Sequence, residues 1–142
     1  WAGRFEVKRG LDRTFIFDGA HNAAGAESFA MTYDELFKDS PKTIVMAILK
    51  DKDQEAIIRE VVKVGDTVLV VPAPTDRTEV PETLVEMIRR TVPKATAQTA
   101  DSIEAALALA YKHTKTGDII AVCGSLYILG DARQWFFHEM SH

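Results

Sequence analysis

The apolar stretch Asp118-Ile-Ile-Ala-Val-Cys123, followed directly by Gly124-Ser125, decides the fold class of this chain. It is short and continuous, without the alternation of polar and apolar residues that marks a strand with one solvated face. Thr14–Asp18, Thr43–Leu49 and Thr67–Val71 carry runs of the same kind. Such runs are typical of strands that are buried on both faces of a parallel sheet.

The segments between these runs carry the spacing of amphipathic helices. In the clearest case, apolar residues recur at i, i+3, i+4, i+7 and i+8 from Ile103 to Tyr111, which places them on one helix face. A last apolar helix is expected at the end of the chain. The expected helical segments have their apolar residues at Ala26–Phe37, Ile57–Val62, Leu84–Thr91, Ile103–Tyr111 and about Leu126–His138.

Local signals predict where some of these helices begin and end. Asp101 and Glu104 have the spacing of a capping box, which predicts that Asp101 begins the helix after it. Gly65 and Gly117 stand where glycine C-caps are expected.

Two weaker strands complete the pattern. Arg4–Lys8 is strand-like and is joined to the next strand by a predicted turn at Arg9-Gly10, and Ala95–Gln98 is expected to join the sheet. The alternation of strands and helices predicts an α/β fold for residues 1–142 as a single domain. We expect a three-layer sandwich with a mostly parallel sheet of about six strands and an antiparallel N-terminal strand.

Composition excludes several classes of protein. The chain has 142 residues, 46% hydrophobic and 27% charged, as in an ordinary globular domain. A net charge of −4 argues against a nucleic-acid partner, and no apolar run is long enough to cross a membrane. The single cysteine excludes an internal disulfide and favours a reducing compartment. Because the first residue is Trp1, we expect a fragment or a processed chain.

Polar residues follow the strands of the predicted sheet. The segments are Asp18-Gly19-Ala20-His21-Asn22, Lys50-Asp51-Lys52-Asp53, Pro72–Arg77 and Gly124-Ser125. Open α/β sheets bind ligands outside the carboxyl ends of their strands, so these segments are the candidate site.

The first and last of these segments have both a functional and a structural interpretation. Asp18 can accept hydrogen bonds from hydroxyls or an ammonium, His21 can donate to a carboxylate or phosphate, and Asn22 can do either. Ser125 can contact a ligand next to Gly124, which lets the backbone approach closely. Alternatively, Asp18 or Asn22 caps the next helix, and Ser125 caps the last one.

The other candidates favour structural roles. Lys50-Asp51-Lys52-Asp53 fits a solvated turn with Asp53 as a helix cap, although Lys50 stays a possible further site residue together with Asn22 and Arg77. Arg77 lies in a proline-rich loop, where exposure without function is the default. Cys123 is expected to be an inert core thiol, because no basic neighbour is evident that would lower its pKa.

Several well-known sites are missing from the sequence. The chain contains neither G-x-x-x-x-G-K-[ST] nor G-x-G-x-x-G, which excludes a P-loop and argues against a classical dinucleotide site. The four histidines are scattered, so no zinc or other metal site is expected. Ser125 is outside G-x-S-x-G, which argues against a hydrolase triad with His21 and Asp18.

Four motifs together carry a resemblance to a known family. Trp1-Ala2-Gly3-Arg4, Asp18-Gly19-Ala20-His21-Asn22, Leu49-Lys50-Asp51-Lys52-Asp53 and Gly124-Ser125-Leu126-Tyr127 occur in this order. The chain resembles the C-terminal domain of the folylpolyglutamate synthase/dihydrofolate synthase family, relatives of the Mur ligases. The resemblance covers nearly the whole chain, and the motifs are specific in combination.

The resemblance implies a Rossmann-like C-terminal domain of a cytoplasmic, ATP-dependent amide ligase. The family activates the carboxylate of dihydropteroate or a folate as an acyl phosphate, which the amino group of L-glutamate attacks. It also implies a partner that this chain lacks, an N-terminal domain that holds the P-loop, the Mg²⁺ ligands and most of the folate site. The isolated domain is then expected to be inactive.

The resemblance further assigns roles to individual residues. Arg4 and Asp18 match ATP-contacting residues, and His21 and Ser125 match residues associated with the incoming glutamate; we take Asp18 and His21 as the catalytic candidates. Two positions depart from the family pattern, since Ala2 and Ala23 stand where proline is usual. Two alternatives stay open, a stand-alone small-ligand-binding or regulatory module and the C-terminal domain of a Mur peptidoglycan ligase.

Overall fold

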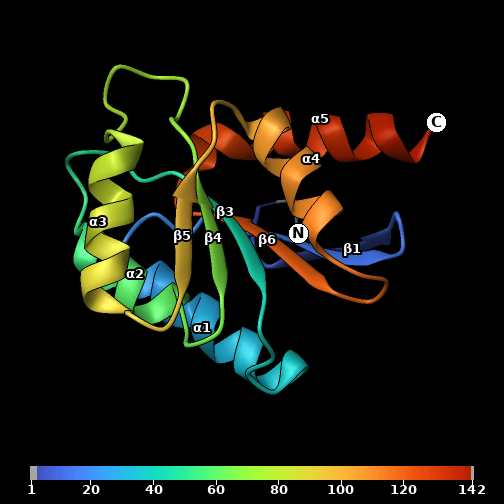
Figure 1. Ribbon diagram of the computed structural model, residues 1–142, viewed down its shortest axis with the longest axis horizontal. Coiled ribbons are helices and arrows are strands. Elements are labelled where there is room, and N and C mark those ends of the chain that lie inside the picture. Colours follow the sequence, from blue (N-terminus) through green and yellow to red (C-terminus); the bar gives the residue numbers. More distant parts are fainter. Residues whose placement is uncertain (1–2, 142) are drawn as a thin grey trace.

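In the described residues, six strands form one sheet in the order β1-β2-β6-β3-β4-β5, and helices cover both of its faces (Figure 1). The structure, a computed structural model, describes residues 3–141. Among these six strands of residues 3–141, β1 and β2 pair antiparallel and the other neighbouring strands pair parallel. The strands are β1 (Glu6–Gly10), β2 (Arg13–Phe17), β3 (Thr43–Met46), β4 (Thr67–Val70), β5 (Thr96–Thr99) and β6 (Ile119–Cys123). The α-helices are α1 (Ala23–Phe37), α2 (Gln54–Val61), α3 (Pro81–Thr91), α4 (Ile103–His113) and α5 (Leu129–Met140), with a short 3₁₀ turn at Leu126–Ile128.

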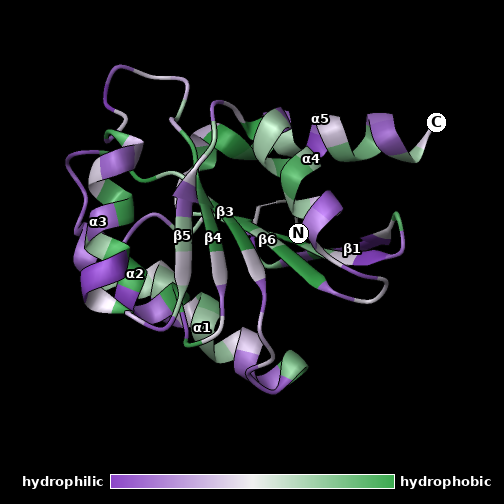
Figure 2. Ribbon diagram, viewed as in Figure 1, coloured by the Kyte–Doolittle hydropathy of each residue, from purple (hydrophilic) through white to green (hydrophobic). Residues whose placement is uncertain are grey.

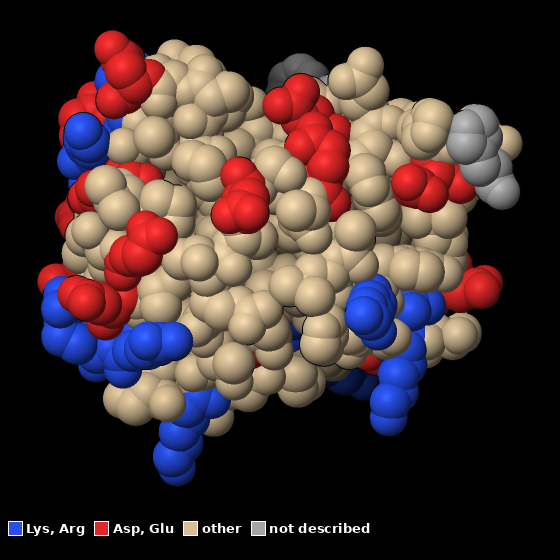
Figure 3. Space-filling model, turned by 45° about the horizontal axis from the view of Figure 1, so that its top comes forward, with Lys and Arg blue, Asp and Glu red and all other residues tan. Residues whose placement is uncertain are grey.

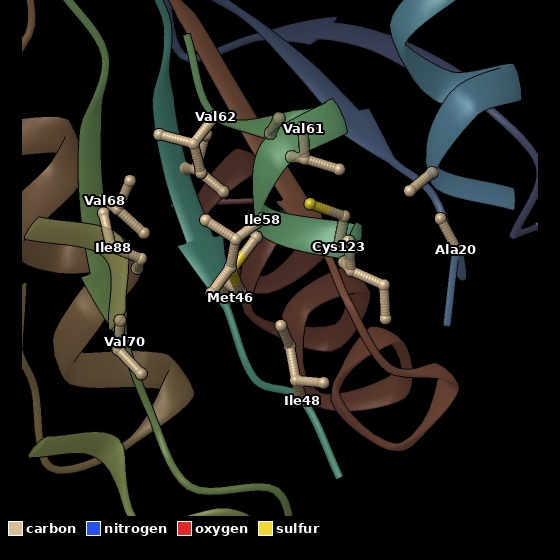
Figure 4. Packing of buried hydrophobic residues seen from close by; sticks show 14 of the residues in the cluster. Ala20, Met46, Ile48, Ile58, Val61, Val62, Val68, Val70, Ile88 and Cys123 are labelled. Carbon is tan, nitrogen blue, oxygen red and sulfur yellow. The ribbon is translucent and has the colours of Figure 1, made fainter. Parts of the chain in front are cut away.

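The core lies in two layers, one on each face of the sheet. Alternate residues of β6 belong to different layers: Cys123 packs with α1, α2 and α3, whereas Val122 packs with α4 and α5. Figure 2 shows the apolar strands between helices whose outer faces are polar, and Figure 4 shows Cys123 beside Met46 and Ile58 in the first layer. This arrangement confirms the predicted three-layer α/β sandwich and explains why its central strands are apolar throughout.

The N-terminal hairpin turns two residues later than the sequence predicts. The strand runs over Glu6–Gly10, and Gly10 pairs with Arg13, so the turn is Leu11-Asp12 and not Arg9-Gly10. Both turn residues have positive φ, 53° and 60°, which is the geometry of a two-residue turn that follows the twist of the strands. Gly10 is the last residue of β1, and Phe136 and Met140 of α5 pack where a side chain would be, so this position requires glycine for close packing and not for a turn.

Three helix ends also differ from prediction. Ser102, not Asp101, caps α4, because the Ser102 hydroxyl accepts a hydrogen bond from the backbone N–H of Ala105 at 3.0 Å. Gly65 and Gly117 are not C-caps, since α2 ends at Val61 and α4 at His113. Both glycines instead have positive φ, 90° and 88°, in the turns that lead into the next strands.

The capping of α4 allows a direct test in this chain. We expect Ser102→Ala to lower the free energy of unfolding by about 1 kcal/mol, because it leaves a helix N–H without its acceptor. Asp101→Ala serves as the matched control, and we expect it to change stability by less than about 0.5 kcal/mol. Urea unfolding of both variants measures the difference. A larger loss for Asp101→Ala would contradict the cap that the structure assigns.

Candidate functional site

The candidate site lies at the edge of the sheet where the parallel strands end. Asp18 follows β2 and Gly124-Ser125 follows β6, and these two strands are neighbours in the sheet. Because β1 runs antiparallel to β2, with Glu6 paired to Phe17, the start of β1 lies at the same edge. Arg4 therefore lies at the same edge as Asp18 and His21, with which it lines one hollow. The resemblance implies that Arg4 and Asp18 contact the same ligand.

The Asp18 carboxylate holds the segment before β1 in place. Its Oδ2 accepts from the backbone N–H of Phe5 at 3.0 Å, and its Oδ1 accepts from that of Ala20 at 2.8 Å. The N–H of Gly19 donates to the carbonyl of Gly3 at 2.8 Å. Burial raises the pKa of Asp18, and the two N–H donors and the charge of Arg4 act in the opposite direction. Asp18 and Gly19 together thus hold Phe5 and Gly3, the residues on either side of Arg4.

The geometry of His21 decides which of its nitrogens carries the proton. Nδ1 lies 2.8 Å from the carbonyl oxygen of Gly19. A carbonyl only accepts hydrogen bonds, so Nδ1 is the donor. In the neutral ring, the lone pair then belongs to Nε2. His21 is half-buried and lines the space in front of the strand ends.

Asn22 and Ser125 each cap a helical segment, which confirms the structural interpretation of these two residues. The side-chain oxygen of Asn22 accepts from the N–H of Gly25 at 2.7 Å at the start of α1. Ser125 Oγ accepts from the N–H of Tyr127 at 3.1 Å. Ser125 is buried, whereas Asn22 is exposed. Capping leaves the Ser125 O–H proton to donate elsewhere, so the cap and a ligand contact are compatible.

Two adjacent hollows divide the candidate residues. The first, about 330 Å³, is lined by Arg4, Asp18, Asn22 and their neighbours. The second, about 190 Å³, is lined by Ser125, Lys52, Arg77, Tyr127 and Leu49. His21 and Leu126 line both hollows, and Leu126 is 58% exposed. The structure therefore brings the four residues of the resemblance to one edge, with His21 between a hollow on the Arg4 side and one on the Ser125 side.

The remaining candidates have varied positions. Lys52 lines the second hollow, whereas exposed Lys50 lines neither hollow. The backbone N–H of Lys50 donates to the carbonyl of Arg77 at 2.8 Å. Asp53 caps α2, as predicted. Cys123 is buried, which confirms its predicted place in the core, and burial raises its pKa to about 12. The sequence pattern predicts a solvated turn at Lys52 and gives Tyr127 no role of its own, but both line the second hollow.

The surface fits the small negative charge of the chain. On the face drawn in Figure 3, basic side chains lie along the left edge and in the lower part of the view, acidic side chains lie along the left edge and over the upper part, and the two kinds are mixed at the edges. In residues 3–141, no helix is long and apolar enough to cross a membrane. Within the same residues, no three histidine, cysteine or acidic side chains are arranged to hold a metal ion.

Comparison with known proteins decides the family. The family model described as Mur ligase, glutamate ligase domain, matches residues 3–126. The chain belongs to this family. Trp1 and Ala2 lie outside the described residues of this Mur ligase domain. Ala2 is one of the two positions where the chain departs from the proline of the family pattern. Ala23, the other departure, is the first residue of α1.

Similar proteins narrow the resemblance to folate ligases. A probable bifunctional folylpolyglutamate synthase/dihydropteroate synthase of Haloferax volcanii is 33% identical over 133 residues, which are 94% of this chain and 15% of that protein. The folylpolyglutamate synthase of Lacticaseibacillus casei is 30% identical, over 94% of this chain and 29% of that protein. The structure of Escherichia coli FolC in complex with DHPP and ADP superposes with a TM-score of 0.83 at 25% identity, over 98% of this chain and 32% of FolC.

These matches confirm the predicted resemblance and the fold. They also show that this Mur ligase domain spans between 15% and 29% of the length of the two curated relatives named above. In both, the larger part of the protein has no counterpart in the 142 residues of this chain.

Proposed function

We propose that this chain is the C-terminal domain of an ATP-dependent ligase that joins L-glutamate to dihydropteroate or a folate through an acyl phosphate. The observation that carries the proposal is the convergence of Arg4, Asp18, His21 and Ser125 around two adjoining hollows in a Mur ligase domain. Such a ligase must hold a polyanion and an amino acid side by side, and the two hollows offer one place for each. A reducing, ATP-containing compartment, the cytoplasm, suits this reaction.

The first hollow fits the phosphates and sugar of ATP. The guanidinium of Arg4 supplies positive charge for the developing phosphate charge, and Asp18 retains carboxylate lone pairs that can accept from sugar hydroxyls. Neither a P-loop nor a Mg²⁺ ligand set is found in the described residues, so we assign both to a partner domain of the same protein. Closure of that domain over this edge would also exclude water from a labile intermediate.

The second hollow fits the incoming amino acid. Its ammonium must lose a proton before the nitrogen attacks the acyl phosphate. The lone pair on Nε2 of neutral His21 can accept that proton, because Nδ1 donates to Gly19. Ser125 can donate its hydroxyl proton to the α-carboxylate. Holding the amine next to the activated carboxylate is mainly a matter of position, which a rigid strand end provides.

Substitution of His21 tests the proposal in the full-length protein. We expect His21→Ala to lower kcat/KM for L-glutamate about 100-fold, because the proton acceptor is lost, while the KM for ATP changes little. Steady-state assays of glutamate-dependent ADP release measure this. His113→Ala is the matched control, since His113 is exposed at the end of α4 and lines a hollow at the other end of the strands. Full glutamate-dependent activity of His21→Ala would contradict the assignment.

The two alternative functions, a stand-alone binding module and a peptidoglycan ligase domain, make different predictions. A stand-alone binding module would bind glutamate without any ATPase domain, and titration calorimetry of this chain alone would detect that binding. A peptidoglycan ligase domain would prefer another amino acid to L-glutamate. The names of the relatives above support the folate ligase over both.

A further inference from the structure

The loop that carries Arg77 is attached firmly to the loop after β3. The N–H of Lys50 donates to the carbonyl of Arg77 at 2.8 Å, Leu49 and Thr78 form an antiparallel bridge, and the N–H of Glu79 donates to the carbonyl of Ile48 at 3.0 Å. The backbone of Arg77 is therefore fixed at the mouth of the second hollow.

The side chain of Arg77 is held by a partner that is itself exposed. Its Nη2 lies 2.7 Å from Oδ2 of Asp51, and the two side chains are 47% and 57% exposed. The hydrogen bond from Arg77 lowers the pKa of Asp51, and the same bond raises that of Arg77, with a smaller contribution from Tyr127. Exposed ion pairs contribute little to folding, so a competing anion can replace Asp51 without loss of the fold.

The second hollow presents more positive charge than a single α-carboxylate requires. Lys52 and Arg77 both line it, next to the hydroxyls of Ser125 and Tyr127. Glutamate carries a second carboxylate on its side chain. A guanidinium can bind a carboxylate through two parallel N–H donors. The bond from Arg77 to Asp51 uses one nitrogen, Nη2.

We propose that Arg77 binds the side-chain carboxylate of the incoming amino acid, and that Asp51 occupies the guanidinium until this carboxylate displaces it. The inference rests on the proposed function and adds to it the residue that selects a diacid. Arg77 is a specificity determinant in this scheme, whereas His21 serves the reacting nitrogen. Asp51 is an internal competitor of the substrate carboxylate for the guanidinium.

Substrate preference in the full-length ligase tests the proposal. The probes are L-glutamate and L-glutamine, which differ in the charge of the side-chain terminus. For Arg77→Gln we expect the KM for glutamate to rise about 10- to 100-fold with kcat nearly unchanged, and the preference for glutamate over glutamine to fall by a similar factor. Arg77→Lys should recover part of the preference, because it keeps the charge but not the paired donors. Asp51→Asn should lower the KM for glutamate a few-fold, because the competitor loses its charge.

Arg59→Gln is the matched control. Arg59 is also exposed and also paired with a carboxylate, Glu55 at 2.6 Å, but it lies on α2 and lines neither hollow. We expect Arg59→Gln to leave the KM for glutamate and the preference for glutamate over glutamine unchanged. An unchanged preference in Arg77→Gln, with His21→Ala still defective, would overturn this inference and leave the proposed function intact. Loss of the proposed function itself would appear as a wild-type protein that does not incorporate glutamate. A rise in the KM for glutamate in Asp51→Asn would overturn the competitor role.

Discussion

Replacing Asp66 by alanine should lower the free energy of unfolding by about 3–5 kcal/mol, because it leaves the ammonium of Lys42 buried and unpaired. The two side chains are 1% and 2% exposed, and Lys42 Nζ lies 2.7 Å from Oδ2 of Asp66. Asp66 also accepts from the backbone N–H groups of Lys42 and Lys63, at 3.0 and 2.9 Å. Urea unfolding of this chain measures the loss.

Two further variants separate burial from charge pairing. Glu55→Ala removes an exposed partner of Arg59 on α2 and should cost less than about 0.5 kcal/mol. The double variant Lys42→Met/Asp66→Leu removes both buried charges and should recover most of the stability lost in Asp66→Ala. Equal losses for Asp66→Ala and Glu55→Ala would show that the Lys42–Asp66 pair is not buried as the structure describes.

The strand order could not be predicted from sequence, but the strands themselves could. Continuous apolar runs mark β2, β3, β4 and β6 because these strands are buried on both faces. The hairpin turn was missed because Leu11 and Asp12 are not the residues that usually adopt positive φ in pairs. Gly10, the obvious turn residue, instead makes room for α5, a contact with residues more than a hundred positions later. Local pattern carries no information on such a contact.

The same limit applies to the candidate site. Asp18, His21 and Ser125 could be predicted because they lie in the segments that follow β2 and β6, and parallel strands end at one edge. The place of Lys52 and Tyr127 beside Arg77 depends on the contact between the loops after β3 and β4 and on the turn after β6. These contacts join residues that are 25 or more positions apart in the chain, as in the bond from Arg77 to Asp51. Spacing in the sequence therefore identified the edge but not the full lining of the second hollow.

Gly124→Ala should be the other strongly destabilising substitution, with a loss of about 3–5 kcal/mol from backbone strain and overlap together. Gly124 has a φ of 102°, and an added Cβ would overlap the carbonyl oxygen of Ala47 in the neighbouring chain segment after β3. Relief of that overlap would push the end of β6 away from β3 and move Ser125 with it. Urea unfolding measures the stability, and the KM for glutamate in the full-length protein reports the displacement of Ser125.

Gly117→Ala is the control that isolates the overlap. Gly117 has a similar φ of 88°, but an added Cβ there would meet no atom within 4 Å. It should therefore cost only about 1–2 kcal/mol, which is the strain of positive φ alone. The difference between the two variants measures how closely β6 approaches the segment after β3 at the site. Equal losses would mean that this approach is looser than the structure describes, and Ser125 would then owe its position to its own cap and not to the glycine before it.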